Sequence, residues 1–119
     1  MYKYIFAGLI AAAAMPVFAG TVYYVDIVNT AASDVVSFEV APAGSDRFHS
    51  VLLGKGPLRG GGDAATIAVR RGEDGCTRDF RIAFSDGRVL THRGFNLCRY
   101  ASYHTDRYLR TQVAASEKP

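Results

Sequence analysis

Residues 75–98, GCTRDFRIAFSDGRVLTHRGFNLC, carry the strongest local signal in this 119-residue chain. Residues 77–84 alternate apolar and polar side chains, as a half-buried strand does, and residues 88–93 form a second β-type run. Asp86-Gly87 stands between the runs and is a preferred filling of a two-residue type I′ turn, in which both residues take positive φ. The stretch therefore predicts a β-hairpin. The side chains that it would turn toward the core are Phe80, Ile82 and Phe84.

The chain's two cysteines, Cys76 and Cys98, bracket this hairpin almost symmetrically. A turn at Asp86-Gly87 would bring them together at the base of the hairpin, where a disulfide would close a loop of about 22 residues. Such a bond stabilises a fold by about 3 kcal/mol, mainly by constraining the unfolded chain. The alternative is a redox-active or metal-binding pair, but the CxxC spacing typical of those sites is missing. The sequence therefore favours a structural disulfide.

The first 19 residues read as a cleaved secretory signal peptide. Lys3 supplies a basic start, residues 4–14 are uncharged and mostly apolar, and Val17 and Ala19 place small residues at the cleavage site. Cleavage is expected between Ala19 and Gly20. The alternative is an uncleaved membrane anchor, but the uncharged run is shorter than the roughly 20 residues that span a bilayer. We therefore expect a periplasmic or secreted protein, in a compartment that permits disulfides.

The predicted strands outside the hairpin are residues 20–29, 35–40, 66–70 and 98–109. Within residues 35–40, the alternation places Val36, Phe38 and Val40 on one buried face. Residues 48–53 fit a short strand or a helical turn equally well, and residues 54–63 form a glycine-rich loop. No long window after the signal peptide shows helical spacing. These short strands predict an all-β fold, either a small antiparallel β-sandwich (Ig-like) or a barrel, with one disulfide.

The mature chain has the size of one domain, which we place at residues 20–112, followed by a flexible C-terminal tail at 113–119. The full sequence has 14 basic and 11 acidic side chains, and Lys3 leaves with the signal peptide. The mature chain is therefore nearly neutral, unlike dedicated nucleic-acid binders, which carry strongly basic patches.

The sequence shows no catalytic or metal-binding motif. His49, His92 and His104 lack the spacings typical of metal ligands, and no serine stands in a G-x-S-x-G elbow. Asp79 and Asp86 are interpreted as a solvated strand residue and a turn residue, rather than as paired catalytic carboxylates. The chain is therefore expected to have no cofactor, no metal and no enzymatic activity.

Two segments are candidates for binding. In the first, residues 99–110, tyrosines and arginines interleave, a composition enriched at interfaces. Its candidate contacts are Arg99, Tyr100, Tyr103, Arg107 and Tyr108. The alternative is an edge strand whose tyrosines pack on the sheet. The second segment is the glycine loop, with Lys55, Arg59, Gly60, Gly61 and Gly62. This loop lacks the P-loop pattern, so it reads as a flexible or backbone-shaped loop.

The mature sequence resembles a group of small exported bacterial domains of unknown function. The most specific shared part is the hairpin pattern, here GCTRDFRIAFSDG at residues 75–87 with NLC at residues 96–98. Further matches are Asn29-Thr30, APAGSDRF at 41–48, LLG at 52–54 and LRGGG at 58–62, with Phe48 where the group often has Trp. The resemblance covers most of residues 22–100. It implies export and an Ig-like sandwich, and it transfers no catalytic residue.

These observations favour a non-enzymatic exported β-domain that contacts an unknown protein or envelope component, with no membrane span after signal cleavage. One alternative is an inhibitor of a hydrolase such as lysozyme or a protease, with residues 54–63 as the docking loop. Another is a small glycan- or anion-binding module. Its binding residues would be Tyr100, Tyr103, Arg107 and Tyr108. The sequence indicates no oligomeric state.

Overall fold

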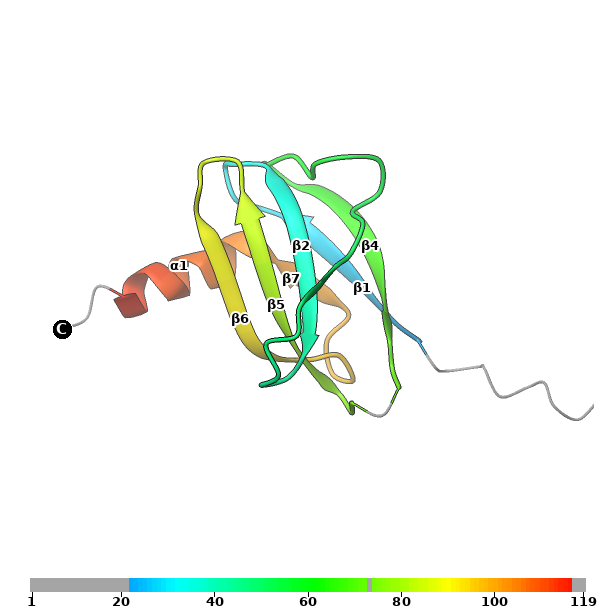
Figure 1. Cartoon of the computed structure of the whole chain (residues 1–119). Helices are drawn as coiled ribbons and strands as arrows, with labels where there is room; N and C mark the ends of the chain where they lie inside the picture. The colour runs from blue at the N-terminus through cyan, green and yellow to red at the C-terminus, as the bar shows by residue number, and fades with distance from the viewer. Residues whose placement is uncertain (1–21, 73, 117–119) are drawn as a thin grey trace, which may run out of the picture.

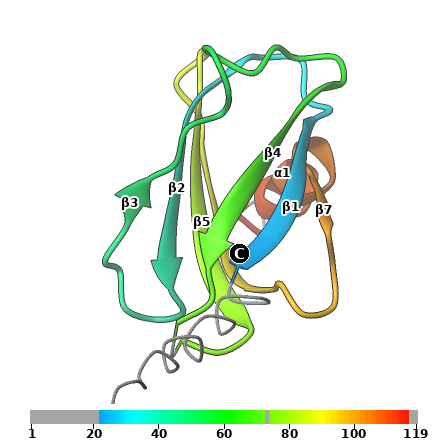
Figure 2. The ribbon, with the colours of Figure 1, turned by 90° about the vertical axis from the view of Figure 1, so that its right-hand side faces the viewer.

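The computed structural model describes residues 22–72 and 74–116. The predicted signal peptide, its cleavage site and residues 117–119 of the predicted tail lie outside these ranges. Seven strands form two sheets that face each other, and one helix follows them (Figures 1 and 2). The predicted small all-β sandwich with one disulfide is confirmed.

The first sheet has the order β4-β1-β7, and the second has the order β3-β2-β5-β6. The strands are β1 (Val22–Asn29), β2 (Val35–Pro42), β3 (His49–Ser50), β4 (Asp63–Arg70), β5 (Thr77–Phe84), β6 (Val89–Asn96) and β7 (Ser102–His104). Every pair is antiparallel except β1 with β7, which run parallel. The sandwich is therefore closed by a pairing between its first and last strands.

The core lies between the two sheets and is built from alternate residues of their long strands. Val25, Ile27 and Ile67 face inward from the first sheet, and Phe80 and Ile82 face them from the second. Phe80 also contacts neighbouring rings, with centroids 5.0 Å from that of Phe38 and 5.3 Å from that of Tyr103. Period-two alternation thus produces the core, as the hairpin sequence predicts.

The hairpin between β5 and β6 has a three-residue loop, so the predicted two-residue type I′ turn is wrong. The Phe84 N–H donates to Arg88 O at 2.9 Å, and the Gly87 N–H donates to Phe84 O at 3.0 Å. Gly87 takes φ 94°, whereas Asp86 is not in the positive-φ region. The Asp86 carboxylate instead accepts a bond from the Arg88 N–H at 3.0 Å, which stabilises this wider loop.

The disulfide joins Cys76 and Cys98 with a Cα–Cα distance of 5.3 Å. It lies just before β5 and just after β6, as predicted. Beside it, the Leu97 N–H donates to Cys76 O at 2.7 Å, and the Tyr23 hydroxyl lies 3.3 Å from Cys98 Sγ. The base of the hairpin is therefore tied to itself and to β1.

Strand β2 buries a different set of residues from the one its alternation predicts. A bulge shifts the register between Val35 and Ser37, so Val35 is buried and Val36 is 52% exposed. Val35 exchanges two backbone hydrogen bonds with Leu58, at 2.8 and 3.0 Å. This extra pairing bends the strand and turns Val36 out of the core. Phe38 and Val40 are buried as predicted.

A second bulge, between Arg78 and Phe80, buries two charged residues of β5. The Arg78 guanidinium donates to five backbone carbonyls at 2.9 to 3.2 Å, three in the β4–β5 connection and two at the strand ends that flank it. Asp79 is only 1% exposed, so its interpretation as a solvated residue is wrong. Because its carboxylate accepts two backbone N–H bonds, it joins the 42–46 turn to β6 instead of facing water.

The last predicted strand, residues 98–109, is mostly wrong. Only Ser102–His104 form a strand, and Thr105–Ser116 form helix α1, which runs past the predicted domain end at 112. The first turn of the helix is tied to β1 and the turn after it, because Thr105 Oγ1 donates to Asn29 Oδ1 at 2.8 Å and Thr30 Oγ1 accepts the Asp106 N–H at 3.0 Å. Buried Leu109 fixes its inner face. The contacts to β1 thus override the strand-like Tyr/Arg alternation.

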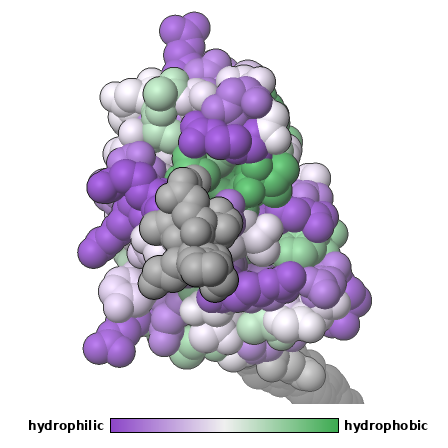
Figure 3. Space-filling model, turned by 90° about the vertical axis from the view of Figure 1, so that its left-hand side faces the viewer, coloured by the Kyte–Doolittle hydropathy of each residue, from purple (hydrophilic) through white to green (hydrophobic). Residues whose placement is uncertain are grey.

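The helix also covers the outer edge of β6. The Gln112 amide pairs with this strand as a peptide group would: its Oε1 accepts the Thr91 N–H at 3.1 Å and its Nε2 donates to Val89 O at 3.0 Å. The face of the molecule on the side of α1 has hydrophilic and intermediate residues around one hydrophobic patch (Figure 3). In the part of the chain that the structure describes, no helix is long and apolar enough to cross a membrane.

Candidate functional site

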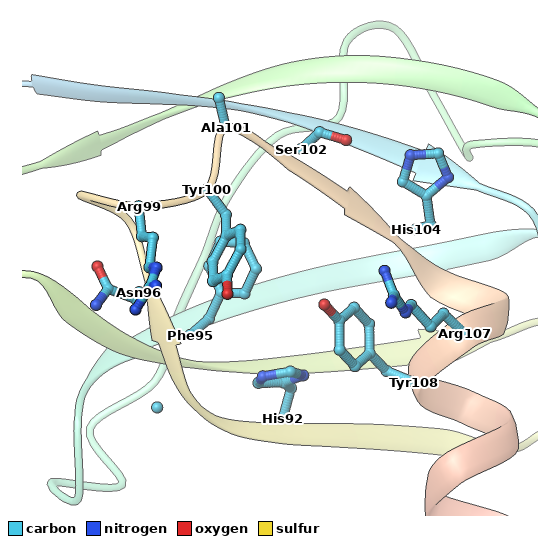
Figure 4. A pocket seen from close by; sticks show the side chains of 11 residues that line it. His92, Phe95, Asn96, Arg99, Tyr100, Ala101, Ser102, His104, Arg107 and Tyr108 are labelled. Atoms are coloured by element: carbon cyan, nitrogen blue, oxygen red, sulfur yellow. The ribbon is translucent and has the colours of Figure 1, made fainter.

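A cleft of about 600 Å³ opens where the edge of one sheet meets the edge of the other (Figure 4). Strand β6 forms one wall and β7 the opposite wall. The β6–β7 connection closes one end, and the first turn of α1 closes the other. The cleft is thus built from sequence between residues 92 and 108, and its volume lies within the range of about 300–1,000 Å³ that is usual for ligand sites.

Four of the five residues predicted from the Tyr/Arg segment line this cleft: Arg99, Tyr100, Arg107 and Tyr108. The fifth, Tyr103, is fully buried beneath it and therefore supports the cleft instead of facing a ligand. Arg99 and Arg107 approach from opposite ends of the cleft, as Figure 4 shows. The sequence analysis does not predict helix α1. This helix places Arg107 and Tyr108 in the same cleft as Arg99 and Tyr100.

The floor of the cleft is a set of packed rings. The Tyr108 ring stacks on the Tyr103 ring at a centroid distance of 4.6 Å and meets the edge of the His92 ring at 4.5 Å. The Tyr103 hydroxyl lies 3.2 Å from His92 Nδ1. Tyr100 packs against Phe95 at 5.9 Å while 53% of its surface stays exposed. These contacts fix the ring orientations before any ligand arrives.

Burial shifts two titratable groups of this floor, the Tyr103 hydroxyl and the His92 ring, toward their neutral forms. It raises the pKa of the Tyr103 hydroxyl, and the neighbouring Tyr108 raises it further. It lowers the pKa of His92 below 6.5, although the negative charge of Asp79 opposes this in part. At pH 7 Tyr103 and His92 are therefore neutral, and the two arginines carry positive charge into the cleft.

The rim of the cleft is positively charged and carries no opposing carboxylate. In residues 22–72 and 74–116, carboxylates form ion pairs with Arg81, Arg88, Arg93 and Arg110, and Arg71 has an interaction partner as well. Neither Arg99 nor Arg107 is among them. The nearest helical carboxylate, Asp106, is bound to Arg110 at 2.9 Å. The cleft therefore offers two unpaired guanidinium groups, which favour planar anions such as carboxylates.

Sequence reasoning missed four polar residues of the cleft: His92, Asn96, Ser102 and His104. The two histidines lack the spacing of metal ligands, and that spacing does not bear on a binding role. Asn96 enters the sequence analysis only as part of the NLC match at residues 96–98, and Ser102 stands in no motif. The only signal that could have found them is their position at facing sheet edges, and this follows from the β1–β7 pairing.

The glycine loop does not join this cleft and packs against residues 29–34 instead. A Cβ atom on Gly60 would lie 2.4 Å from Ala32 O. The N–H groups of the three glycines are bound to that turn: Gly60 donates to Asp34 Oδ1, Gly61 to Ala31 O and Gly62 to Asn29 O. They are not free to cradle an anion. Lys55 and Arg59, the other residues predicted in this loop, are exposed.

A second, smaller hollow of about 370 Å³ lies beside β2 and β3 and is lined by residues 36–38 and 50–57. Its rim includes Leu52, whose side chain is 85% exposed, while the flanking Val51 and Leu53 pack on the core. In the described parts of the chain, no group of three or more His, Cys, Asp or Glu residues could hold a metal ion.

Comparisons with protein families, curated proteins and solved structures found no match to this chain, so the geometry of the cleft is the basis for assigning a function.

Proposed function

We propose that this chain is an exported, non-enzymatic β-domain of the bacterial group that its hairpin resembles, and that it binds a protein or envelope component through the cleft. The observation that carries the proposal is the pair of unpaired arginines, Arg99 and Arg107, beside the exposed Tyr100 ring. Arginine and tyrosine, together with tryptophan, are the side chains enriched where binding energy concentrates at interfaces. A fold that leaves them unpaired at one preformed hollow is suited to recognition.

Export is supported by the signal-like start of the sequence and by the Cys76–Cys98 disulfide. Structural disulfides persist in oxidising compartments and are rare in the cytosol of mesophiles. Expression of the full chain in a bacterial host, followed by mass determination, tests this part directly. The expected product begins at Gly20 and lies outside the cytoplasm. A product that keeps residues 1–19 in the cytoplasm would overturn it.

The binding role is tested by quantitative affinity capture from envelope and periplasmic extracts. The double variant Arg99→Gln with Arg107→Gln should no longer capture the components that the wild-type chain captures. Arg59→Gln is the matched control, because it removes the same charge from an exposed arginine outside the cleft. The proposal fails if the double variant captures the same components as wild type, or if Arg59→Gln loses them equally.

Inhibition of a hydrolase is a second candidate, favoured by the exposure of Leu52. A projecting apolar side chain whose neighbours are anchored to the core loses little entropy on entering an enzyme cleft. This moves the candidate inhibitory segment to residues 51–57, because Gly60 to Gly62 are packed against the turn. Assays against lysozymes and common proteases, with Leu52→Asp as the comparison, test it. Equal inhibition by the wild-type chain and the Leu52→Asp variant, or inhibition by neither, would exclude residues 51–57 as the inhibitory segment.

A further inference from the structure

We infer that the ligand of the cleft is a carboxylate-bearing sugar, with the carboxylates bound by Arg99 and Arg107 and a ring face stacked on Tyr100. This inference rests on the proposed function, because it names the ligand class of the same cleft. It follows from three features of the lining, which are its charge, its hydrogen-bonding groups and its aromatic faces.

The positive charge of the cleft lining favours an anionic ligand. Arg99 and Arg107 are both exposed and stand at opposite ends of the hollow, while no lining residue is acidic (Figure 4). Two separated guanidinium groups fit a ligand that repeats its negative charge better than one with a single anionic head. An acidic oligosaccharide has this repeat, because each unit can carry one carboxylate.

The polar groups between the arginines are largely donors. Asn96 Oδ1 already accepts the Cys98 N–H at 3.0 Å, so its amide nitrogen is the group left to bind a ligand. The Ser102 hydroxyl and the His104 ring also line the cleft, and both residues are exposed. Within the described residues, none of these three donor groups has a protein hydrogen-bond partner. They therefore complement a ligand rich in hydroxyl and ring oxygens.

The aromatic groups offer flat faces for the apolar side of a sugar ring. Tyr100 is 53% exposed and held against Phe95, and Tyr108 is fixed by its stack on Tyr103. Aromatic faces are electron-rich and attract the C–H edges that a pyranose ring presents. An acidic peptide would instead need a strand edge to extend. The β7 edge offers only three residues, and on the β6 edge the Gln112 amide already binds the Thr91 N–H and Val89 O. The cleft is therefore better suited to a saccharide.

The test is calorimetric titration of the full mature chain with trigalacturonate, its fully methyl-esterified form, hexaglutamate and inorganic phosphate. Trigalacturonate should bind, and esterification should weaken binding at least tenfold because it removes the negative charge. Hexaglutamate and phosphate should bind at least tenfold more weakly. Equal binding of the ester, tighter binding of the peptide or of phosphate, or no binding of trigalacturonate would each overturn the inference.

The same titration with variants places the ligand in the cleft. Arg99→Gln and Arg107→Gln should each weaken trigalacturonate binding about tenfold, whereas Arg59→Gln should not change it. Tyr100→Ala should weaken it similarly, whereas Tyr24→Ala, a matched change at a 65% exposed tyrosine on β1, should not. Unchanged melting temperatures would exclude unfolding as the cause. Equal effects of cleft and control variants would overturn the placement.

The two proposals fail in distinguishable ways. If capture of envelope components depends on Arg99 and Arg107 but trigalacturonate does not bind, the sugar inference fails and the binding role stands. If capture is indifferent to both arginines, the proposed function itself fails.

Discussion

Replacing Asp79 with Asn should lower the free energy of unfolding by about 3 kcal/mol, although the change is nearly isosteric. The Asp79 side chain is 1% exposed, and its two oxygens accept three bonds. Oδ1 accepts the Gly94 N–H at 2.8 Å, while Oδ2 accepts the Gly44 N–H and Arg93 Nη1, both at 2.9 Å. Asp79 therefore joins β5 to β6 and to the turn after β2.

The magnitude follows from these three bonds. An asparagine has one oxygen, so its amide nitrogen must face either the Gly94 N–H or the Gly44 N–H, and one of these partly buried donors loses its acceptor. A hydrogen bond to a charged group contributes about 1.5–3 kcal/mol, and an unsatisfied buried donor costs about 1–3 kcal/mol. Their combination gives about 3 kcal/mol. For a domain of this size, that corresponds to a fall in melting temperature of roughly 12–24 °C.

Thermal and denaturant unfolding of the mature chain measures this effect, with Asp46→Asn as the control. Asp46 binds the same Arg93 Nη1 at 2.7 Å, but its side chain is 68% exposed. Water can replace that partner, so the control should change stability by less than about 1 kcal/mol. If Asp79→Asn lowers the free energy of unfolding as little as Asp46→Asn does, the assignment of Asp79 as a buried structural acceptor is wrong.

The same variant has a pH signature. Burial raises the pKa of the Asp79 carboxyl, but the two N–H bonds and the Arg93 guanidinium outweigh it and hold the pKa below 3.8. The carboxylate therefore contributes its stability above the unfolded value of about 3.9, and the contribution is lost as the pH falls through the folded pKa. Asp79→Asn should lose less stability than wild type between pH 4 and pH 2.

Three further predictions concern the glycine loop, the disulfide and the cleft floor. Gly60→Ala should destabilise the domain by about 1–3 kcal/mol, because its Cβ would lie 2.4 Å from a backbone oxygen; Gly56→Ala, with open space around it, should be nearly neutral in the same melts. The double variant Cys76→Ser with Cys98→Ser should lower the free energy of unfolding, measured in urea, by about 3 kcal/mol. Reducing the disulfide of the wild-type chain should lower it by the same amount. The pKa of His92 lies below 6.5 in the folded chain, so the unfolded chain takes up the proton first and the wild-type domain loses stability between pH 7 and pH 5. His92→Gln should make this loss of stability smaller. An unchanged slope would contradict this.

Much of the fold could be predicted from local patterns. The alternation of residues 77–84 correctly gives the inward positions of Phe80, Ile82 and Phe84, because a strand has a fixed period of two. The pairing of Cys76 with Cys98 follows from the hairpin between them. Patterns fail where a distant segment changes the register. Val36 is exposed because Leu58 pairs with Val35, and no local rule contains that contact.

The candidate site could be predicted in part. Tyrosine and arginine composition selects four residues that the structure places in one cleft, Arg99, Tyr100, Arg107 and Tyr108, and their role in binding stays a prediction. The facing wall from β6 could not be predicted, because it depends on which sheet edges meet. The helix left a weak signal that was missed: Asp106 lies in its first turn and pairs with Arg110 four residues later.

The pairing of β1 with β7 has a kinetic consequence. Ile27 aligns with Tyr103, and Asn29 bonds Thr105 across 76 positions of the chain. The first strand therefore cannot complete its sheet until almost the entire chain is available, and closing so long a loop slows folding. We expect this domain to reach its native state only after residues 102–105 are available to pair with β1, and to have an incomplete first sheet until then.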